Sequence, residues 1–206
     1  MVRFCICMLL VIATSASVCG QTQFSGKVIY LPVESQNIST AAKEQAPMKV
    51  VIRAKGDQVR WEEFTEKGSR IIITDYTKME QHVLIEFLGT LCAIESPKDQ
   101  ITHDSPMISQ GKKHGKIMER KCFSAEDTSG QIVWTAGPKL IHPFLPNVDG
   151  IPVEFWRSTA EGAVLYRAIS IIEEVPSDRF FAIPSEYTVV KSDELSELFN
   201  LTSTKR

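Results

Sequence analysis

Short runs of strand-forming residues, separated by turn residues, dominate the chain from Phe24 onward. They recur at a spacing of roughly 10 to 12 residues and include "FSGKVIYL", "MKVVIRA", "VRWEEF", "SRIIITDY" and "QHVLIEFL". Between the second and third runs stands Lys55-Gly56-Asp57, which is typical of a hairpin because glycine adopts the positive φ of a tight turn. The pattern predicts an antiparallel sheet, sandwich or barrel.

Several of these runs are apolar on both faces, which a sheet with one wet face would not need. In "LYRAISII", strict alternation puts Leu165, Ile169 and Ile171 on one face, and Tyr166, Ala168 and Ile172 on the other. We therefore expect a mainly β, α+β fold in which a curved antiparallel sheet, with a few short helices or loops outside, encloses a core or a cavity. "STAAKEQA" is one such helix or a flexible loop.

The second half of the chain predicts two further hairpins. Residues 97–115 are polar and indicate a long loop, after which "KIMERKCFSAE" is one strand, "DTSG" a turn and "QIVWTA" the next strand. Prolines interrupt the stretch from Pro138 to Pro152, so any helix there is short. A hairpin around Glu161-Gly162 follows, then the extended "FFAIPSEYTVV" and a closing helix, "DELSELFNL".

The first 20 residues have the order of a secretory signal peptide. Arg3 precedes an apolar run to Ala13, and small residues follow. That run is shorter than the about 20 residues that a membrane-spanning helix needs, although a membrane anchor is the alternative. We expect a periplasmic or secreted protein with residues 21–206 as one domain and no transmembrane segment in the mature chain. Cleavage after Ser17, or lipidation of Cys19, are further alternatives; Val18 argues against the lipid.

Five cysteines are present, and three of them lie in the signal region. The mature chain keeps Cys92 and Cys122. In an oxidising compartment they could form one disulfide bond, which would stabilise the fold by roughly 3 kcal/mol. The alternative is two separate buried thiols, since a free cysteine packs as a small apolar residue.

Little in the sequence indicates catalysis. The net charge of −2 argues against a nucleic-acid partner, and the hydrolase, Walker and Rossmann motifs are absent. The histidines show no metal-ligand spacing, so we expect surface or loop positions for His82, His103, His114 and His142. Adjacent carboxylates, Glu62-Glu63 and Glu173-Glu174, point to opposite faces of a strand and indicate solvated residues. We expect no enzyme activity, cofactor or metal.

Apolar side chains remain as the candidate binding site. Their number is enough to line the concave side of a curved sheet, where they form either a packed core or a lipid-sized pocket. The candidates for such a cavity are Trp61, Ile71, Ile73, Val83, Ile85, Phe87, Trp134, Phe155, Ile169 and Ile171.

The order of several elements resembles a known family. "FSGKVIY", "MKVVIRAKGDQVRWE", "IIITDYTK", a run ending at Cys122, Trp134 after the next turn, and "FFAIPSEY" follow one another as in the secreted bacterial family called domain of unknown function 4412. The closing F-x-I-P-x-x-Y element corresponds to Phe181, Ile183, Pro184 and Tyr187. That family is similar to the lipoprotein carriers LolA and LolB. The resemblance implies a half-open barrel with a site for an apolar ligand, but implies no catalytic residue.

We therefore expect a non-enzymatic binding protein that holds a lipid or an acyl chain on the concave face. The alternative is an interaction or structural module of the cell envelope, whose partner would be another envelope protein pairing with an exposed edge strand. A packed interior would favour this second hypothesis.

Overall fold

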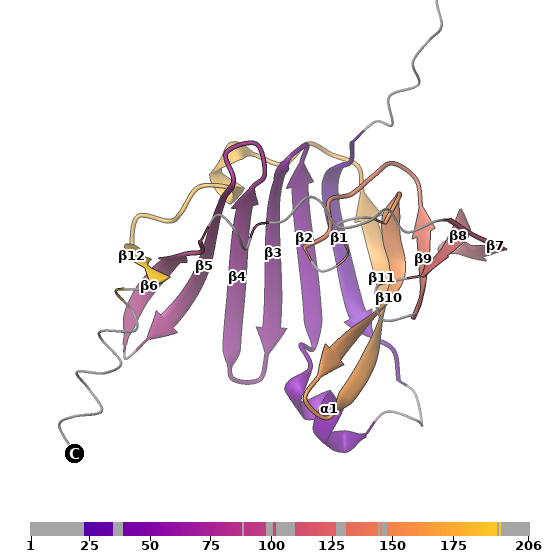
Figure 1. The fold of residues 1–206 in the computed structure, drawn as a ribbon, viewed down its shortest axis with the longest axis horizontal. Coiled ribbons are helices and arrows are strands. Elements are labelled where there is room, and N and C mark those ends of the chain that lie inside the picture. The colour runs from indigo at the N-terminus through magenta and orange to yellow at the C-terminus, as the bar shows by residue number, and fades with distance from the viewer. Residues whose placement is uncertain are drawn as a thin grey trace, which may run out of the picture.

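The computed structural model of the chain describes residues 23–34, 39–87, 89–97, 101, 110–126, 131–143, 145, 148–192 and 194. Their strands join in one open sheet of 12 strands, with β12 and β7 at its edges (Figure 1). From one edge the first six are β12 (Thr188–Lys191), β6 (Thr90–Glu95), β5 (Glu80–Phe87), β4 (Gly68–Asp75), β3 (Gln58–Thr65) and β2 (Lys49–Lys55). The order continues with β1 (Ser25–Pro32), β11 (Gly162–Ile172), β10 (Ile151–Thr159), β9 (Ile132–Ala136), β8 (Arg120–Glu126) and β7 (Gln110–Ile117).

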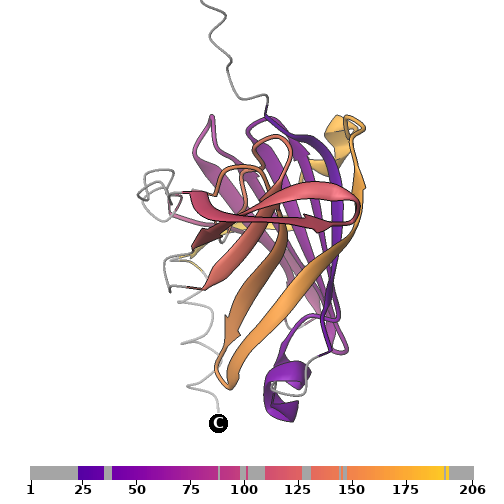
Figure 2. The same ribbon diagram turned by 90° about the vertical axis from the view of Figure 1, so that its right-hand side faces the viewer.

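The sheet curves until distant strands face one another across its concave side (Figure 2). In the sheet order β3 and β10 are separated by β2, β1 and β11, yet the rings of Trp61 on β3 and Phe155 on β10 lie 6.3 Å apart. The prediction of a mainly β fold with a curved sheet is confirmed. Neighbouring strands are antiparallel except β12, which pairs with β6 in parallel.

The main core lies on the concave side. Side chains alternate along the strands, so Val28 and Tyr30 of β1 point into it together with Val50 and Ile52 of β2, and all four are fully buried. The helix α1 (Thr40–Gln45) begins at Ser39, whose hydroxyl accepts a hydrogen bond from the Ala42 amide at 3.1 Å, and Ala42 joins the same core.

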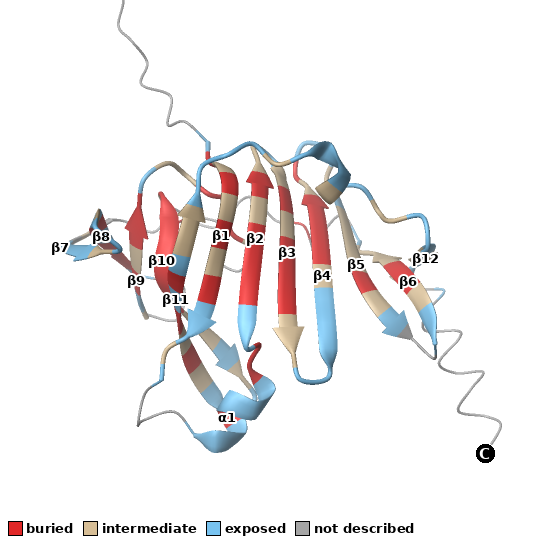
Figure 3. Cartoon of the chain, turned by 180° about the vertical axis from the view of Figure 1, so that it is seen from behind, coloured by how far each residue is buried: buried red, intermediate tan, exposed pale blue. Residues whose placement is uncertain are grey.

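A second, smaller cluster lies on the convex side of β4, β5 and β6. It consists of Ile73, Leu84 and Ala93, with Ile71, Ile183 and Tyr187 packed against it. The last two belong to the segment that follows the short 3₁₀ helix η2 (Asp178–Phe180) and leads to β12. Figure 3 shows this segment crossing the convex face. The extended "FFAIPSEYTVV" piece is therefore a strap over the sheet as well as its last strand.

The region predicted as a loop and one strand is instead a hairpin. Residues 110–115, predicted as part of the long loop, belong to β7, which pairs with β8. The turn between them uses Met118 and Glu119 with φ of 51° and 60°. Such turns usually contain asparagine or glycine, so the sequence carries no signal for this one.

A β-bulge in β11 changes which face each isoleucine occupies. The register with β1 shifts between Ile29 and Tyr30, so one extra residue of β11 lies opposite that pair. Ile169 is 52% exposed, whereas Ile171 packs against the main core. The prediction that these two share a face is wrong, because strict alternation does not continue through a bulge.

Three predicted features lie outside the described residues. They are the signal peptide at 1–20, the turn at 127–130, and nearly all of the closing helix at 193–201. The strands on either side of residues 127–130 pair as an antiparallel hairpin, as predicted.

Candidate functional site

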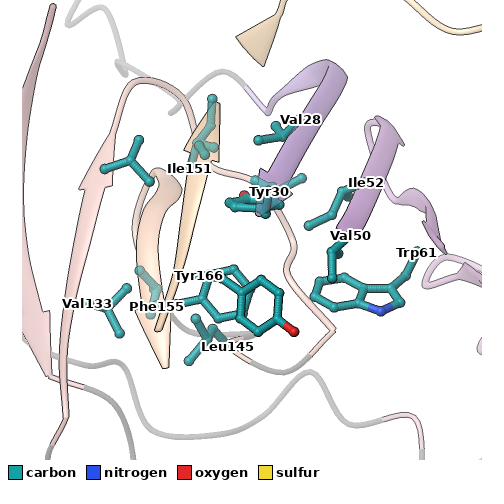
Figure 4. Close-up of a cluster of buried hydrophobic side chains, with 14 of the residues drawn as sticks. Val28, Tyr30, Val50, Ile52, Trp61, Val133, Leu145, Ile151, Phe155 and Tyr166 are labelled. Atoms are coloured by element: carbon teal, nitrogen blue, oxygen red, sulfur yellow. The ribbon is translucent and has the colours of Figure 1, made fainter. Parts of the chain in front are cut away.

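A row of rings fills the middle of the concave face (Figure 4). Tyr30 meets Phe155 edge to face at 5.1 Å between ring centroids, and Phe155 stacks on Tyr166 at 5.6 Å. His142 lies 4.8 Å from Phe155 and 4.9 Å from Trp61, both in edge-to-face geometry. These rings come from β1, β3, β10, β11 and a segment between strands, so the row joins both halves of the curved sheet.

His142 belongs to the segment between β9 and β10, which is described at residues 137–143, 145 and 148–150 and crosses the concave face. Leu140, Ile141, Leu145 and Val148 of this crossing segment are buried in the main core. Main-chain hydrogen bonds hold its ends, from the Phe24 amide to the Lys139 carbonyl at 2.7 Å and from the Leu140 amide to the Gly150 carbonyl at 3.2 Å. Apolar side chains hold its middle against the sheet.

Burial makes the titratable groups of the row chemically inert near neutral pH. Desolvation, assisted by the charge of Arg157, lowers the pKa of His142 to about 3, so the imidazole is neutral. Burial also raises the pKa values of Tyr30 and Tyr166 far above the usual range. The Tyr166 hydroxyl donates to the Pro47 carbonyl at 2.6 Å, while the Tyr30 hydroxyl has no hydrogen-bond partner among the described residues. Such a site suits packing against apolar groups.

Two neighbouring carboxylates on β3 are each held by two arginines, on opposite faces of the sheet. On the convex side Glu62 bonds Arg53 at 2.6 Å and also Arg60. On the concave side Glu63 bonds Arg70 of β4 at 2.8 Å and Arg157 of β10. The prediction that Glu62 and Glu63 are solvated is wrong, since both are buried, although they do point to opposite faces.

The concave ion-pair cluster, made of Glu63, Arg70 and Arg157, adjoins the ring row. The indole Nε1 of Trp61 donates to Glu63 Oε1 at 2.7 Å. Arg157 reaches Glu63 across the hollow of the sheet, from β10 to β3. Its charge helps to lower the pKa of His142 and partly offsets the rise that burial causes in the pKa of Tyr166, so Arg157 lies near both. Arg70 is the most exposed member, with 43% of its side chain accessible.

An opening beside Arg70 separates β4 and β5 beyond their last paired residues, Ile71 and Leu84. The two strands pair from Asp75↔Glu80 to Ile71↔Leu84 and then diverge. A pocket of about 480 Å³ lies there, with Ser69 and Arg70 on one side and Ile85 and Glu86 on the other, and Tyr187 of the convex cluster also lines it.

The predicted cavity residues divide among several places. Trp61, Val83, Trp134, Phe155 and Ile171 belong to the main core or pack against it, and Ile85 lines the opening. Ile71 and Ile73 lie in the convex cluster, because they alternate with Ile72 of the concave core. Ile169 is exposed, and the side chain of Phe87 lies outside the described residues.

The ring of Trp134 packs close to the neighbouring hairpin. A Cβ atom at Gly115 of β7 would lie 3.1 Å from this ring. The glycine therefore lets β7 approach Trp134. Cys122 and Trp134 belong to a hairpin, which is the ordinary interpretation of that stretch of sequence.

Cys92 and Cys122 are free thiols in the structure, so the disulfide alternative is not formed. Cys92 lies on β6 and Cys122 on β8, close to opposite edges of the sheet order. The Cys122 thiol donates to the Arg120 carbonyl at 3.2 Å, and burial raises its pKa. This second thiol belongs to the main core, as the packing alternative predicts.

Sequence reasoning missed His142 and the arginines. His142 lies in a segment between strands, within the surface or loop positions that the sequence predicts, but its burial is not predicted. Its apolar neighbours Leu140 and Ile141 are the available signal for burial. Nothing in the sequence pairs Glu63 with Arg157, 94 residues away. Only the curvature of the sheet brings them together.

Within the described residues, no group of three or more His, Cys, Asp or Glu side chains could hold a metal ion. A search of the same residues for a helix with the length and apolar character needed to cross a membrane finds none. Comparisons of the chain with protein-family models and with curated proteins find no match. The resemblance to domain of unknown function 4412 and to the LolA-like carriers stays a prediction.

Proposed function

We propose that this chain is a secreted or periplasmic, non-enzymatic binding protein that holds an apolar ligand, a lipid or an acyl chain, on the concave face of a LolA-like half-barrel. The observation that supports the proposal is that a segment between two strands fills the concave face. Two buried rings from different strands, Trp61 of β3 and Phe155 of β10, pack against His142 of the crossing segment, which is not one of the strands. The crossing segment occupies the place of the ligand.

Binding would exchange the middle of the crossing segment for the ligand. Four buried apolar side chains, Leu140, Ile141, Leu145 and Val148, hold this segment, at roughly 1.5–3 kcal/mol each. A ligand chain gains about 0.8 kcal/mol for each methylene that it buries. A chain of about 8 to 15 methylenes is therefore needed to offset the 6–12 kcal/mol of the segment. We expect long acyl chains to bind and short ones not to.

The test is a series of saturated alcohols of increasing chain length, measured by displacement of a fluorescent apolar probe from the mature protein. We expect binding to begin at a threshold length. Leu145→Ala weakens the hold of the crossing segment and should shift this threshold to shorter chains. The control is Leu84→Ala, which truncates an equally apolar side chain in the convex cluster and should leave the threshold unchanged. Absence of binding at every length, in protein that remains folded, would sink the proposal.

The packing of the core by itself favours the second candidate, an interaction module of the cell envelope. Its binding element would be the edge strand β7, where Lys113, His114 and Lys116 are exposed. A partner could add a strand to this edge. A photo-crosslinking residue placed at His114 in cells should then capture one discrete envelope protein, whereas the same residue placed at the exposed Glu174 should not. No capture from His114 would count against this candidate.

A further inference from the structure

At Trp61 the ring row adjoins two cationic side chains. Two guanidinium groups, Arg70 and Arg157, share one buried carboxylate, Glu63. We propose that these two arginines receive the compact oxyanion head, a carboxylate or a phosphate monoester, of a single-chain amphiphile whose tail lies along the ring row. This inference rests on the proposed function and names the class of ligand.

The contacts of Glu63 show how a ligand head would be held. Arg70 donates to Glu63 Oε2 through Nε at 3.0 Å and places Nη2 2.8 Å from the same oxygen. Arg157 and the indole of Trp61 both donate to Glu63 Oε1. The planar guanidinium fork matches a carboxylate or a phosphate, so an incoming head can share or take over these donors. Glu63 is then an internal competitor that occupies the head position.

The opening between β4 and β5 gives the head a route to this cluster. Its volume of about 480 Å³ lies within the range of about 300–1,000 Å³ that is usual for ligand pockets. Arg70 lines the opening and also bonds Glu63, so one side chain connects solvent with the buried carboxylate. Ile85, on the other side, gives the opening an apolar wall.

The convex cluster has the same chemistry but a different role. Arg53 and Arg60 hold Glu62, and they also hold the strap: Arg53 lies 4.5 Å from the ring of Phe180, and Arg60 donates to the Phe180 carbonyl at 3.1 Å. Only 12% of the Arg60 side chain is accessible, against 43% for Arg70. Among these four arginines Arg70 is the most accessible to solvent, and the cluster to which it belongs adjoins the ring row.

Because the concave cluster adjoins the ring row, the position of the tail follows from the position of the head. Trp61 donates to Glu63 with its indole nitrogen, and its ring meets that of His142 in edge-to-face geometry, 4.9 Å between centroids. A head bound at Arg70 and Arg157 thus places the first methylenes beside Trp61. The remainder of the tail would follow the path that the crossing segment fills, toward Phe155.

The experiment measures the affinities of laurate, dodecyl phosphate and lauryl alcohol for the full-length mature protein by titration calorimetry. These probes have the same tail and differ in the head. We expect laurate or dodecyl phosphate to bind at least about tenfold more tightly than the alcohol, since charge-assisted hydrogen bonds have that strength. Arg70→Gln and Arg157→Gln should each remove most of that difference. Arg53→Gln, whose side chain is as exposed as that of Arg157, is the matched control and should preserve it.

Glu63→Gln gives a result of the opposite sign. The amide keeps an oxygen for Trp61 but removes the competing charge, so we expect tighter binding of the anions and unchanged binding of the alcohol. If the ion pair were purely structural, Glu63→Gln would weaken the binding of all three probes. Equal binding of the three probes, unaffected by the arginine variants, would overturn the inference and leave the proposed function standing. Binding of none of them, together with no binding at any length in the alcohol series, would overturn both.

Discussion

Glu62 and Glu63 are neighbours on one strand, and each is buried between two arginines, but the two faces of the sheet use this arrangement differently. On the convex face Arg53 and Arg60 hold a strap that covers the small cluster around Ile73. On the concave face the arginines come from β4 and β10 and connect the two walls of the hollow. The same local sequence therefore fastens a strap on one side and joins two walls on the other. The part of the chain that faces each carboxylate decides which of these two roles its arginines have.

The largest difference between the faces should appear when a ring is removed from the concave row. Among the described residues, Phe155 lies against four other rings and is almost completely buried. Phe155→Ala should lower the free energy of unfolding by about 3–5 kcal/mol, measured by urea denaturation. Phe123→Ala removes a ring that is 37% exposed and should cost much less. Similar losses for both variants would contradict the packed ring row.

Acid should destabilise the concave side through His142. Its pKa is about 3 in the folded chain and about 6.5 when unfolded, so only the unfolded chain takes up this proton between those values. The contribution of His142 to stability is therefore complete above about pH 6.5 and falls as the pH drops toward 3. Arg157, beside His142, opposes the added charge, and Glu63 is paired with Arg157.

The measurement is the free energy of unfolding of the parent and of His142→Gln at several pH values. We expect the parent to lose on the order of a few kcal/mol more than the variant between pH 6.5 and 4. Carboxylates that titrate in this range affect both proteins, so the difference between the two curves isolates His142. Parallel curves would show that His142 is not buried as a neutral group.

Loosening the strap should act locally. Phe180→Ala removes the ring under Arg53, and we expect faster hydrogen exchange in residues 178–191 with a global loss of about 1–2 kcal/mol or less. Exchange in β1, β2 and β11 should stay unchanged. Loss of protection throughout the sheet would mean that the convex strap is part of the main cooperative unit.

The smallest effect concerns two isoleucines, two positions apart, that the bulge in β11 places in different surroundings. Ile169→Ser should change the free energy of unfolding by no more than about 0.5 kcal/mol, because the side chain is largely exposed. Ile171→Ser should cost about 1–2 kcal/mol, since it packs against the main core. Equal costs would contradict the bulge and restore strict alternation.

Several features of this protein are determined locally and could be predicted. Gly56 adopts a φ of 58° in the turn after β2, and the hairpins around Gly56 and Gly162 form where glycine interrupts runs of strand-forming residues. Trp61 and Phe155 were selected as concave residues for their size and apolar character, and both lie there. Local signals failed where the chain makes an exception, as in the Met118-Glu119 turn and the bulge at Ile169.

The sequence by itself determined the strands, most of their turns and the surplus of apolar residues that a curved sheet must bury, because these depend on neighbours in the chain. Only the tertiary structure decided which apolar residues face the hollow, that His142 fills it, and that Glu63 meets Arg157. Those contacts join β3 and β10 across the concave side, and no periodicity along one strand reports on the strand that will face it. Burial then sets the charge states of these groups: the buried carboxylates are paired with arginines, and the buried histidine is neutral.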